Sequence, residues 1–212
     1  MEVNDVSIAR GGERKTRKQR SDGERSRRAI LREAAKLATT EGLTGLSISR
    51  LADAVGMSKS GLFAHFGSKE ELQLATIETA SEIFEEEVVA PAQAEADGIG
   101  RLRALTEGFL RHVEERVFPG GCFFASVAAE MDTHPGPVRD RAIEMTNGWF
   151  AELLAAVRDA QAEGAIDAGE DPAQVAFELN AYLLMGNAAF VAMDSPVPLA
   201  AARRAIDRRL RA

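Results

Sequence analysis

The chain has 212 residues, of which 45% are hydrophobic and 28% are charged, a balance typical of a globular protein with a sizeable core. One cysteine and three histidines, without CxxC or HxxxH spacing, argue against a disulfide framework and a metal site. No segment has the pattern of an export signal, and the longest uncharged run, 179–193, is short for a membrane span. We therefore expect a cytoplasmic protein with no membrane partner.

The net charge of −7 is divided unevenly along the chain. Residues 1–70 hold 14 Lys and Arg against 9 Asp and Glu, whereas residues 71–212 hold 12 against 24. A local basic patch is enough for contacts with phosphate groups, so the acidic total does not exclude DNA binding. The most basic stretch, 10–28, is equally typical of a solvated tail, and we expect residues 1–23 to form a flexible basic arm.

Apolar residues recur at helical spacing in nearly every segment, and no long strand-like alternation interrupts them. The predicted helices span 24–41, 47–55, 58–66, 68 to about 94, 98–117, 122–131, 135–162, 171 to about 193, and 196 to the C-terminal region. The helix at "SKEE" has the best-defined start, because Ser68 and Glu71 can form a capping box. The sequence thus predicts an all-α fold of about nine helices.

The stretch "SISRLADAVGMSKSGLFAHF" holds two short helices separated by a turn. Leu51 and Ala52 share one face of the first helix, and Leu62 lies on the apolar face of the second. Gly56 stands where a helix ends in a left-handed residue, and Ser58 can cap the next helix. This pattern favours a helix-turn-helix, whose second helix enters the major groove of DNA, over a helical hairpin inside a core.

These residues resemble the DNA-binding region of the TetR family of bacterial transcriptional regulators. The resemblance covers roughly residues 28–75 and rests on Gly56-Met57-Ser58 in the turn, Phe63 and His65-Phe66 in the second helix, and Ser68-Lys69-Glu70-Glu71-Leu72 at the start of the fourth. "GGCFFASVAAEM" has a mild likeness to the sixth helix of some members. Phe63 stands where the family most often has Tyr, so a hydroxyl that could donate to phosphate is missing.

The resemblance implies an N-terminal three-helix DNA-binding domain, 24–70, and a larger helical ligand-binding and dimerisation domain, 71–212. It implies that Lys59, Ser60 and Gly61 reach base edges. It also implies contacts with the DNA backbone from Ser47, Arg50, Ser58, Phe63, His65 and Lys69. The alternatives are a solvated lysine at a helix start for Lys69, and a packed histidine between helices for His65.

In such a protein the last two helices pair with those of a second chain. Apolar stripes with small residues between them suit a four-helix dimer interface, and burial in the chain's own core is the alternative. The predicted dimer residues are Leu179, Tyr182, Leu183, Gly186, Phe190, Ile206 and Leu210.

A ligand cavity would lie among aromatic and sulfur-containing side chains of the middle helices, although any one of them can equally be ordinary core. The predicted lining residues are Phe109, His112, Cys122, Phe123, Met131, Met145, Trp149, Phe177 and Asn180. Glu107 and Glu130 are further polar candidates for orienting a ligand.

The predicted function is a ligand-responsive transcriptional repressor that binds a palindromic DNA operator as a homodimer and is released by a small, largely apolar molecule. No P-loop, Gly-x-Ser-x-Gly or metal-ligand spacing is found, so no catalytic residue, cofactor or metal is expected. A helical protein-interaction module is the rival class, but it leaves the turn chemistry and the basic end unexplained. The sequence leaves three alternatives open: activation instead of repression, a redox role of Cys122, and DNA contact by the arm.

Overall fold

The computed structural model describes the backbone of residues 9–131, 133 and 135–211, and the side chains of those from residue 23 onward. All regular structure in these ranges is helical, and nine helices have eight or more residues, as predicted. They are α1 (Ala9–Glu41), α2 (Ile48–Val55), α3 (Lys59–Phe66), α4 (Lys69–Phe84), α6 (Gly98–Glu114), α7 (Phe123–Met131), α8 (Pro137–Ala162), α9 (Pro172–Met193) and α10 (Val197–Arg209).

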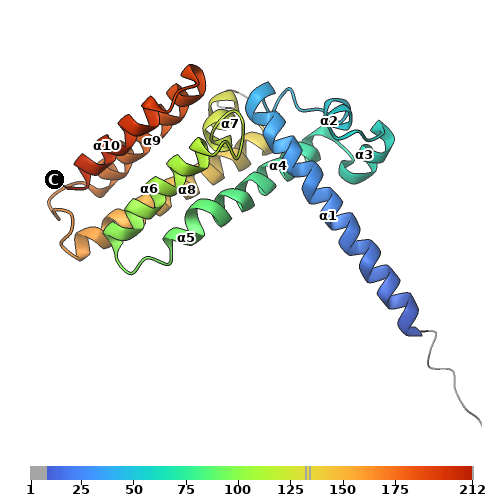
Figure 1. Cartoon of the computed structure of the whole chain (residues 1–212), viewed down its shortest axis with the longest axis horizontal. Helices are drawn as coiled ribbons and strands as arrows, with labels where there is room; N and C mark the ends of the chain where they lie inside the picture. Colours follow the sequence, from blue (N-terminus) through green and yellow to red (C-terminus); the bar gives the residue numbers. More distant parts are fainter. Residues whose placement is uncertain (1–8, 132, 134, 212) are drawn as a thin grey trace, which may run out of the picture.

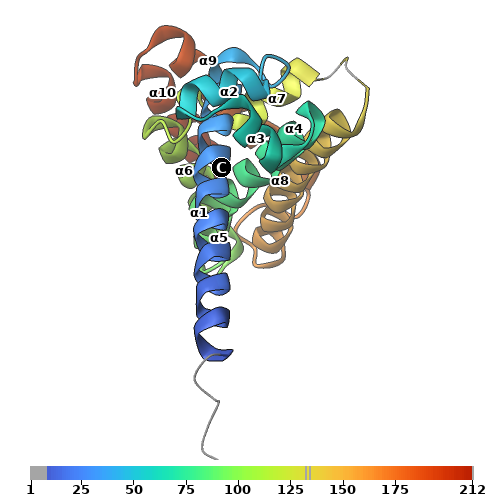
Figure 2. The same ribbon diagram turned by 90° about the vertical axis from the view of Figure 1, so that its right-hand side faces the viewer.

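A small N-terminal unit and a larger helical body make up the molecule (Figures 1 and 2). The small unit consists of α1, α2 and α3 packed on one another and on α4. In the body, α8 packs against α6, α7 and α9, and α10 lies along α9. α3 and the C-terminus lie at opposite ends of the molecule, and α4 leads from one unit into the other (Figure 1).

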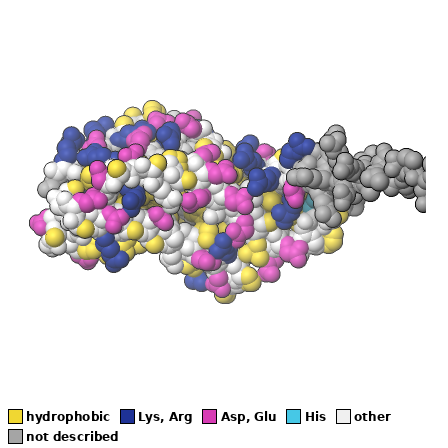
Figure 3. Space-filling view, turned by 90° about the horizontal axis from the view of Figure 1, so that it is seen from below, with side chains coloured by type: hydrophobic (Ala, Val, Ile, Leu, Met, Phe, Trp, Pro, Cys, Tyr) yellow, Lys and Arg dark blue, Asp and Glu magenta, His cyan; other side chains and the backbone are white. Residues whose placement is uncertain are grey.

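The first helix starts earlier than the sequence predicts. α1 begins at Ala9 instead of residue 24, so residues 9–23 of the expected flexible arm continue this helix. Residues 1–8 of that arm lie outside the described residues. The side chains at 25, 27, 28 and 32 are exposed, and Figure 3 shows Lys and Arg side chains near the grey segment, with acidic ones across the middle of this face.

The helix predicted to run from 68 to about 94 changes its winding near its end. α4 passes into a π-helical turn, η1 (Glu85–Val89), and then into α5 (Ala90–Ala92). Pro91 explains this change, because its ring has no N–H and collides with the carbonyl four residues earlier in a regular α-helix. The carbonyl at that position, Glu87, is approached instead by the Arg111 side chain at 3.5 Å.

The capping box at the start of α4 forms only in part. The Ser68 hydroxyl accepts a hydrogen bond from the Glu71 N–H at 3.1 Å, as predicted. The Ser68 N–H, however, donates to the carbonyl of Phe66 at 2.6 Å instead of to the Glu71 side chain. The turn at Gly67, with φ at 67°, draws the Ser68 amide back toward α3.

Two glycines give a matched test of backbone conformation. Gly56 has φ at 67° and Gly148 lies inside α8, and a Cβ at either would meet no atom within 4 Å. Gly56→Ala is expected to destabilise the fold by about 1–2 kcal/mol, because an L-residue is strained in the left-handed region. Gly148→Ala should stabilise it by about 1 kcal/mol through helix propensity. Urea unfolding of both variants measures the change in the free energy of unfolding. Equal changes in the two variants would contradict the conformational explanation.

Candidate DNA-binding surface and ligand pocket

The helix-turn-helix is built from local hydrogen bonds. The Ser47 hydroxyl caps α2 by accepting from the Arg50 N–H at 3.2 Å. Gly56 ends α2 in the left-handed conformation, with its N–H donating to the Ala52 carbonyl. The Ser58 hydroxyl then caps α3 by accepting from the Gly61 N–H at 3.1 Å. The inner faces of both helices are buried through Leu51, Ala52, Leu62 and Phe66.

The first turn of α3 carries an exposed polar and cationic surface. Lys59 and Ser60 are exposed, and Lys59 forms no ion pair with any residue that the structure describes. A Cβ at Gly61 would lie 3.0 Å from the Ser58 hydroxyl, so glycine keeps this cap compact. Phe63 is 56% exposed on the same helix. The free N–H groups at such a helix start, together with the ammonium group, suit an anionic partner.

The predicted phosphate-binding cations Arg50 and Lys69 already make contacts within the chain. Arg50 Nε and Nη2 donate to the Glu41 carboxylate at 2.8 and 2.5 Å, and the pair holds the pKa of Glu41 below its ordinary value. Lys69 Nζ donates to the Thr44 carbonyl at 2.6 Å. Each cation keeps further N–H donors for DNA. His65 is half-buried with its ring centroid 6.1 Å from that of Phe66, which fits the packing alternative.

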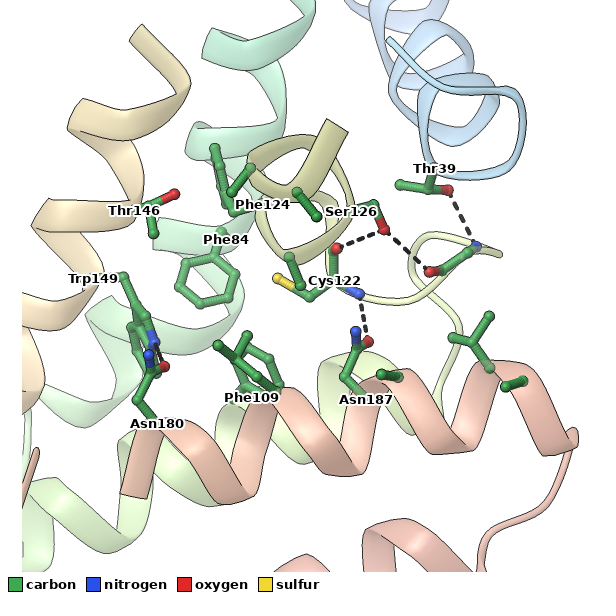
Figure 4. Close-up of a pocket in the computed structure, with 18 residues that line it drawn as sticks. Thr39, Phe84, Phe109, Cys122, Phe124, Ser126, Thr146, Trp149, Asn180 and Asn187 are labelled. Atoms are coloured by element: carbon green, nitrogen blue, oxygen red, sulfur yellow. Dashed lines mark hydrogen bonds between the residues drawn. The ribbon is translucent and has the colours of Figure 1, made fainter. Parts of the chain in front are cut away.

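A cavity of about 620 Å³ lies in the body, beside α1. Four predicted ligand-binding residues line it: Phe109, Cys122, Trp149 and Asn180 (Figure 4). The sequence reasoning missed the aromatic side chains of Phe84 and Phe124 and the polar ones of Thr39, Ser126, Thr146 and Asn187. No lining residue in the described part of the chain carries a charge.

Four of the other predicted ligand residues face elsewhere, and those predictions are wrong for this cavity. Phe123 and Met131 are buried in the core and do not reach the cavity. The residue of α7 that lines the cavity is the next one along, Phe124. Phe177 is 60% exposed on the outside of α9. Met145 faces a separate, smaller hollow, with its sulfur 3.0 Å from the Ser81 hydroxyl.

His112, the fifth, is a buried structural side chain. Its Nδ1 lies 2.8 Å from the Glu87 carboxylate, which ties α6 to the π-turn η1, and its ring packs edge-on against Phe84 and Phe118. Burial lowers the pKa of His112 even though Glu87 acts in the opposite direction. Burial likewise raises the pKa of the Cys122 thiol to about 11, which argues against a reactive thiolate for redox sensing.

Glu130 joins the body to the DNA-binding unit instead of facing the cavity. Its carboxylate accepts from the N–H groups of Leu43 and Thr44, both at 2.7 Å, and from the Thr44 hydroxyl. Gln73 of α4 donates to the Leu43 carbonyl at 2.6 Å. The loop between α1 and α2 is therefore held by α7 and α4 together. Glu107, the other acidic candidate, pairs with Arg203 of α10.

The predicted dimer stripe of the last two helices mostly faces inward. Five of its members are buried within the same chain: Leu179, Leu183, Phe190, Ile206 and Leu210. Gly186 is buried where α9 crosses α10, and a Cβ there would lie 2.9 Å from the Cβ of Ala202. Tyr182 alone is partly exposed. The alternative, burial in the chain's own core, holds for the buried positions.

The exposed apolar face of α9 is rotated from the predicted one. Phe177, Met185 and Met193 of α9 are 60, 69 and 64% exposed, and Val197 of α10 is 63% exposed. By length and composition α9 could cross a membrane, but it packs against α8 and α10, and 39% of its most apolar window is buried. We define Phe177, Met185, Met193 and Val197 as the outer face of α9 and α10.

Two family models cover the two parts of the chain. Residues 30–76 match "Bacterial regulatory proteins, tetR family", and residues 98–206 match "Tetracyclin repressor-like, C-terminal domain". The chain belongs to the TetR family. It is therefore a DNA-binding transcriptional regulator with a helix-turn-helix. Because this family is non-enzymatic, the expectation that the chain is not an enzyme is confirmed.

Two known transcriptional regulators resemble this chain at low identity. The transcriptional regulator AcuR of Cereibacter sphaeroides is 26% identical over 71% of this chain and 69% of its own. The HTH-type transcriptional regulator TcmR of Streptomyces glaucescens is 31% identical over 61% of this chain and 53% of its own.

Solved structures share the fold over nearly the whole chain. A TetR regulator from Chloroflexus aurantiacus superposes with a TM-score of 0.79 at 24% identity, over 90% of this chain and 94% of that one. AibR, solved in complex with isovaleryl coenzyme A and operator DNA, has a TM-score of 0.68 at 26% identity, over 87 and 95% of the two chains.

Proposed function

We propose that this TetR-family regulator acts in the cytoplasm as a repressor, binds a palindromic operator as a homodimer, and releases it when a small, largely apolar effector enters the cavity. The single observation that carries this proposal is the cavity itself, which has an aromatic lining and reaches Thr39 of α1. A ligand in a pocket that is lined by both the body and the DNA-binding unit contacts both parts, so its binding can shift their relative arrangement.

The exposed first turn of α3 supports sequence reading by Lys59, Ser60 and Gly61. In this arrangement the start of the reading helix enters the major groove, where bidentate contacts discriminate bases. Ser47, Ser58, Arg50, His65 and Lys69 then contact the backbone of the operator and set the register.

The outer face of α9 and α10 supports the dimer. Four large apolar side chains of these two helices are each more than half exposed, and exposed apolar surface of this kind is typical of an interface with another protein chain. A two-fold axis through this face places two α3 helices on successive major grooves, about 34–36 Å apart.

The route from cavity to DNA runs through α7 as well as α4. Ser126 lines the cavity, and four residues later Glu130 grips the α1–α2 loop. The Gly120 N–H also donates to the Thr39 hydroxyl at 3.1 Å, beside the cavity. An effector that displaces α7 therefore moves the loop that precedes the helix-turn-helix, together with α4 that follows it.

Replacing Glu130 tests this connection. Glu130→Ala is expected to raise the hydrogen-exchange rates of the Leu43 and Thr44 amides by about tenfold or more, since both lose their acceptor. Glu107→Ala removes an acidic side chain that pairs with Arg203 of α10, and should leave these two amides unchanged. Unaltered protection of Leu43 and Thr44 in Glu130→Ala would contradict the proposed connection.

The proposed function is tested by selecting DNA ligands from a random duplex library with the full-length protein. The expected product is an inverted repeat bound by one dimer, with half-sites about one helical turn apart. Placed between a promoter and a reporter gene, this site should lower expression when the regulator is present. Recovery of single, non-repeated sites, or increased reporter expression, would overturn the repressor proposal.

A further inference from the structure

Two asparagine side chains on α9 have their orientation set by groups that can only donate. The Trp149 indole Nε1–H donates to Asn180 Oδ1 at 3.0 Å, and the Cys122 backbone N–H donates to Asn187 Oδ1 at 2.9 Å. Indole and backbone N–H groups have no acceptor capacity, so the amide oxygen must face them. The amide oxygen of each asparagine points at these partners (Figure 4), and its NH₂ group is left for another acceptor.

Neither of these NH₂ groups donates to any residue that the structure describes. Both asparagines line the cavity, and Asn187 is 95% buried. Because both side chains line the cavity, an acceptor on a bound ligand can form the hydrogen bond that each NH₂ group lacks within the described chain. The cavity therefore holds two donor groups that await acceptors.

The two donors are separated by a defined distance. Asn180 and Asn187 are seven residues apart on one continuous helix, α9, and therefore lie on the same face, about 10 Å apart along its axis. The hydroxyls of Thr39, Ser126 and Thr146, by contrast, already donate to backbone carbonyls of their own helix turns, at 2.8, 3.3 and 3.0 Å. The donors that the lining offers are thus concentrated on α9.

The remaining wall is aromatic and uncharged. Phe109 and Trp149 stack with ring centroids 5.8 Å apart, and Phe84 meets Trp149 edge-on at 5.2 Å. Ring faces and edges of this kind favour a flat aromatic molecule. Without a lining charge, a carboxylate or phosphate group would lose its hydration without gaining a counter-ion.

We propose that the effector is a neutral, flat aromatic compound with two carbonyl oxygens near opposite ends, which accept hydrogen bonds from the NH₂ groups of Asn180 and Asn187. This inference rests on the proposed function, because it names the class of ligand for the same cavity. It departs from the acyl coenzyme A found with AibR, whose phosphates have no cation in this lining.

Three naphthalenes of matched shape test the inference on the unmodified full-length protein. 2,6-Diacetylnaphthalene carries two carbonyl acceptors, 2,6-diethylnaphthalene carries none, and naphthalene-2,6-dicarboxylate carries two charges. Trp149 is the one tryptophan of the chain and lines the cavity, so its fluorescence reports binding. We expect the diacetyl compound to bind about tenfold more tightly than the diethyl compound, and at least about a hundredfold more tightly than the dicarboxylate.

An Asn180→Asp variant tests the donor itself. The new carboxylate still accepts from Trp149 Nε1–H but has no NH₂ group, so the affinity for the diacetyl compound should fall about tenfold. Asn147→Asp introduces the same change at an exposed position of α8 outside the cavity and should leave this affinity unchanged. The expected order among the three naphthalenes does not depend on either variant.

Separate readouts distinguish this inference from the proposed function. Equal binding of the diethyl and diacetyl compounds, tighter binding of the dicarboxylate, or no fluorescence change up to the solubility limit of the diacetyl compound would overturn the donor assignment. Fluorescence anisotropy of labelled operator measures release independently. If the diacetyl compound binds in the expected order but operator remains bound, the donor assignment stands and the effector role of the cavity fails.

Discussion

Met185→Glu is expected to convert the proposed dimer into a monomer and to lower operator affinity on the order of a thousandfold, because one molecule then binds only one half-site. Met185 is the most exposed large apolar side chain of the outer face of α9 and α10. It borders an apolar groove formed with Gly186 and Ala189 of α9 and with Pro198 and Ala201 of α10. A two-fold interface repeats the substitution, so two carboxylates would lose their hydration near the axis.

Light scattering after size-exclusion chromatography measures the mass, and operator titration measures the affinity. Ala155→Glu adds the same charge at an exposed position of α8 and should leave both values unchanged. A Met185→Glu protein that stays dimeric at micromolar concentration would place the dimer interface elsewhere. A wild-type protein that is monomeric under these conditions would contradict the half-site spacing as well.

The helix-turn-helix was predictable because its determinants are local. Gly56 and Ser58 lie within three residues of each other, and each acts through a hydrogen bond to a neighbouring turn. Helix ends at prolines, such as the start of α9 at Pro172, were predictable for the same reason. The fold class followed from apolar spacing over the whole chain.

The inward face of α9 was not predictable, because this helix is apolar nearly all round. Leu179 and Leu183 form one stripe, Phe177 and Met185 another, and periodicity alone does not say which faces the core. The structure buries the first pair and exposes the second. Packing against α8 and α10 decides between them, and this packing depends on residues far away in the sequence.

The cavity was predicted only in part for a related reason. Phe123 and Phe124 are adjacent, and the rotation of α7 about its axis decides which of them reaches the cavity. The hydrogen bond from the Leu43 N–H to the Glu130 carboxylate joins residues that are 87 positions apart, and no local sequence pattern predicts it. The asparagine donors emerge only once Trp149 and Cys122 are placed beside α9.

Lys59→Ala is expected to lower operator affinity by about thirtyfold while leaving the dimer and its thermal stability unchanged, since a good base contact contributes about 1–3 kcal/mol. Lys59 is exposed at the first turn of α3, and the structure gives it no ion pair among the described residues, so its removal disturbs no internal contact. Arg158→Ala removes one exposed cation from α8 and controls for the change in net charge.

Titrations against the operator and against operators with one changed base pair, each at several salt concentrations, separate two roles of Lys59. A base-reading lysine makes the variant lose discrimination at one position of each half-site. A phosphate-binding lysine instead weakens all sequences alike and reduces the dependence of binding on salt by about one ion per monomer. Unchanged affinity in Lys59→Ala would remove this residue from the interface, and would leave Ser60 and Gly61 as the reading positions of α3.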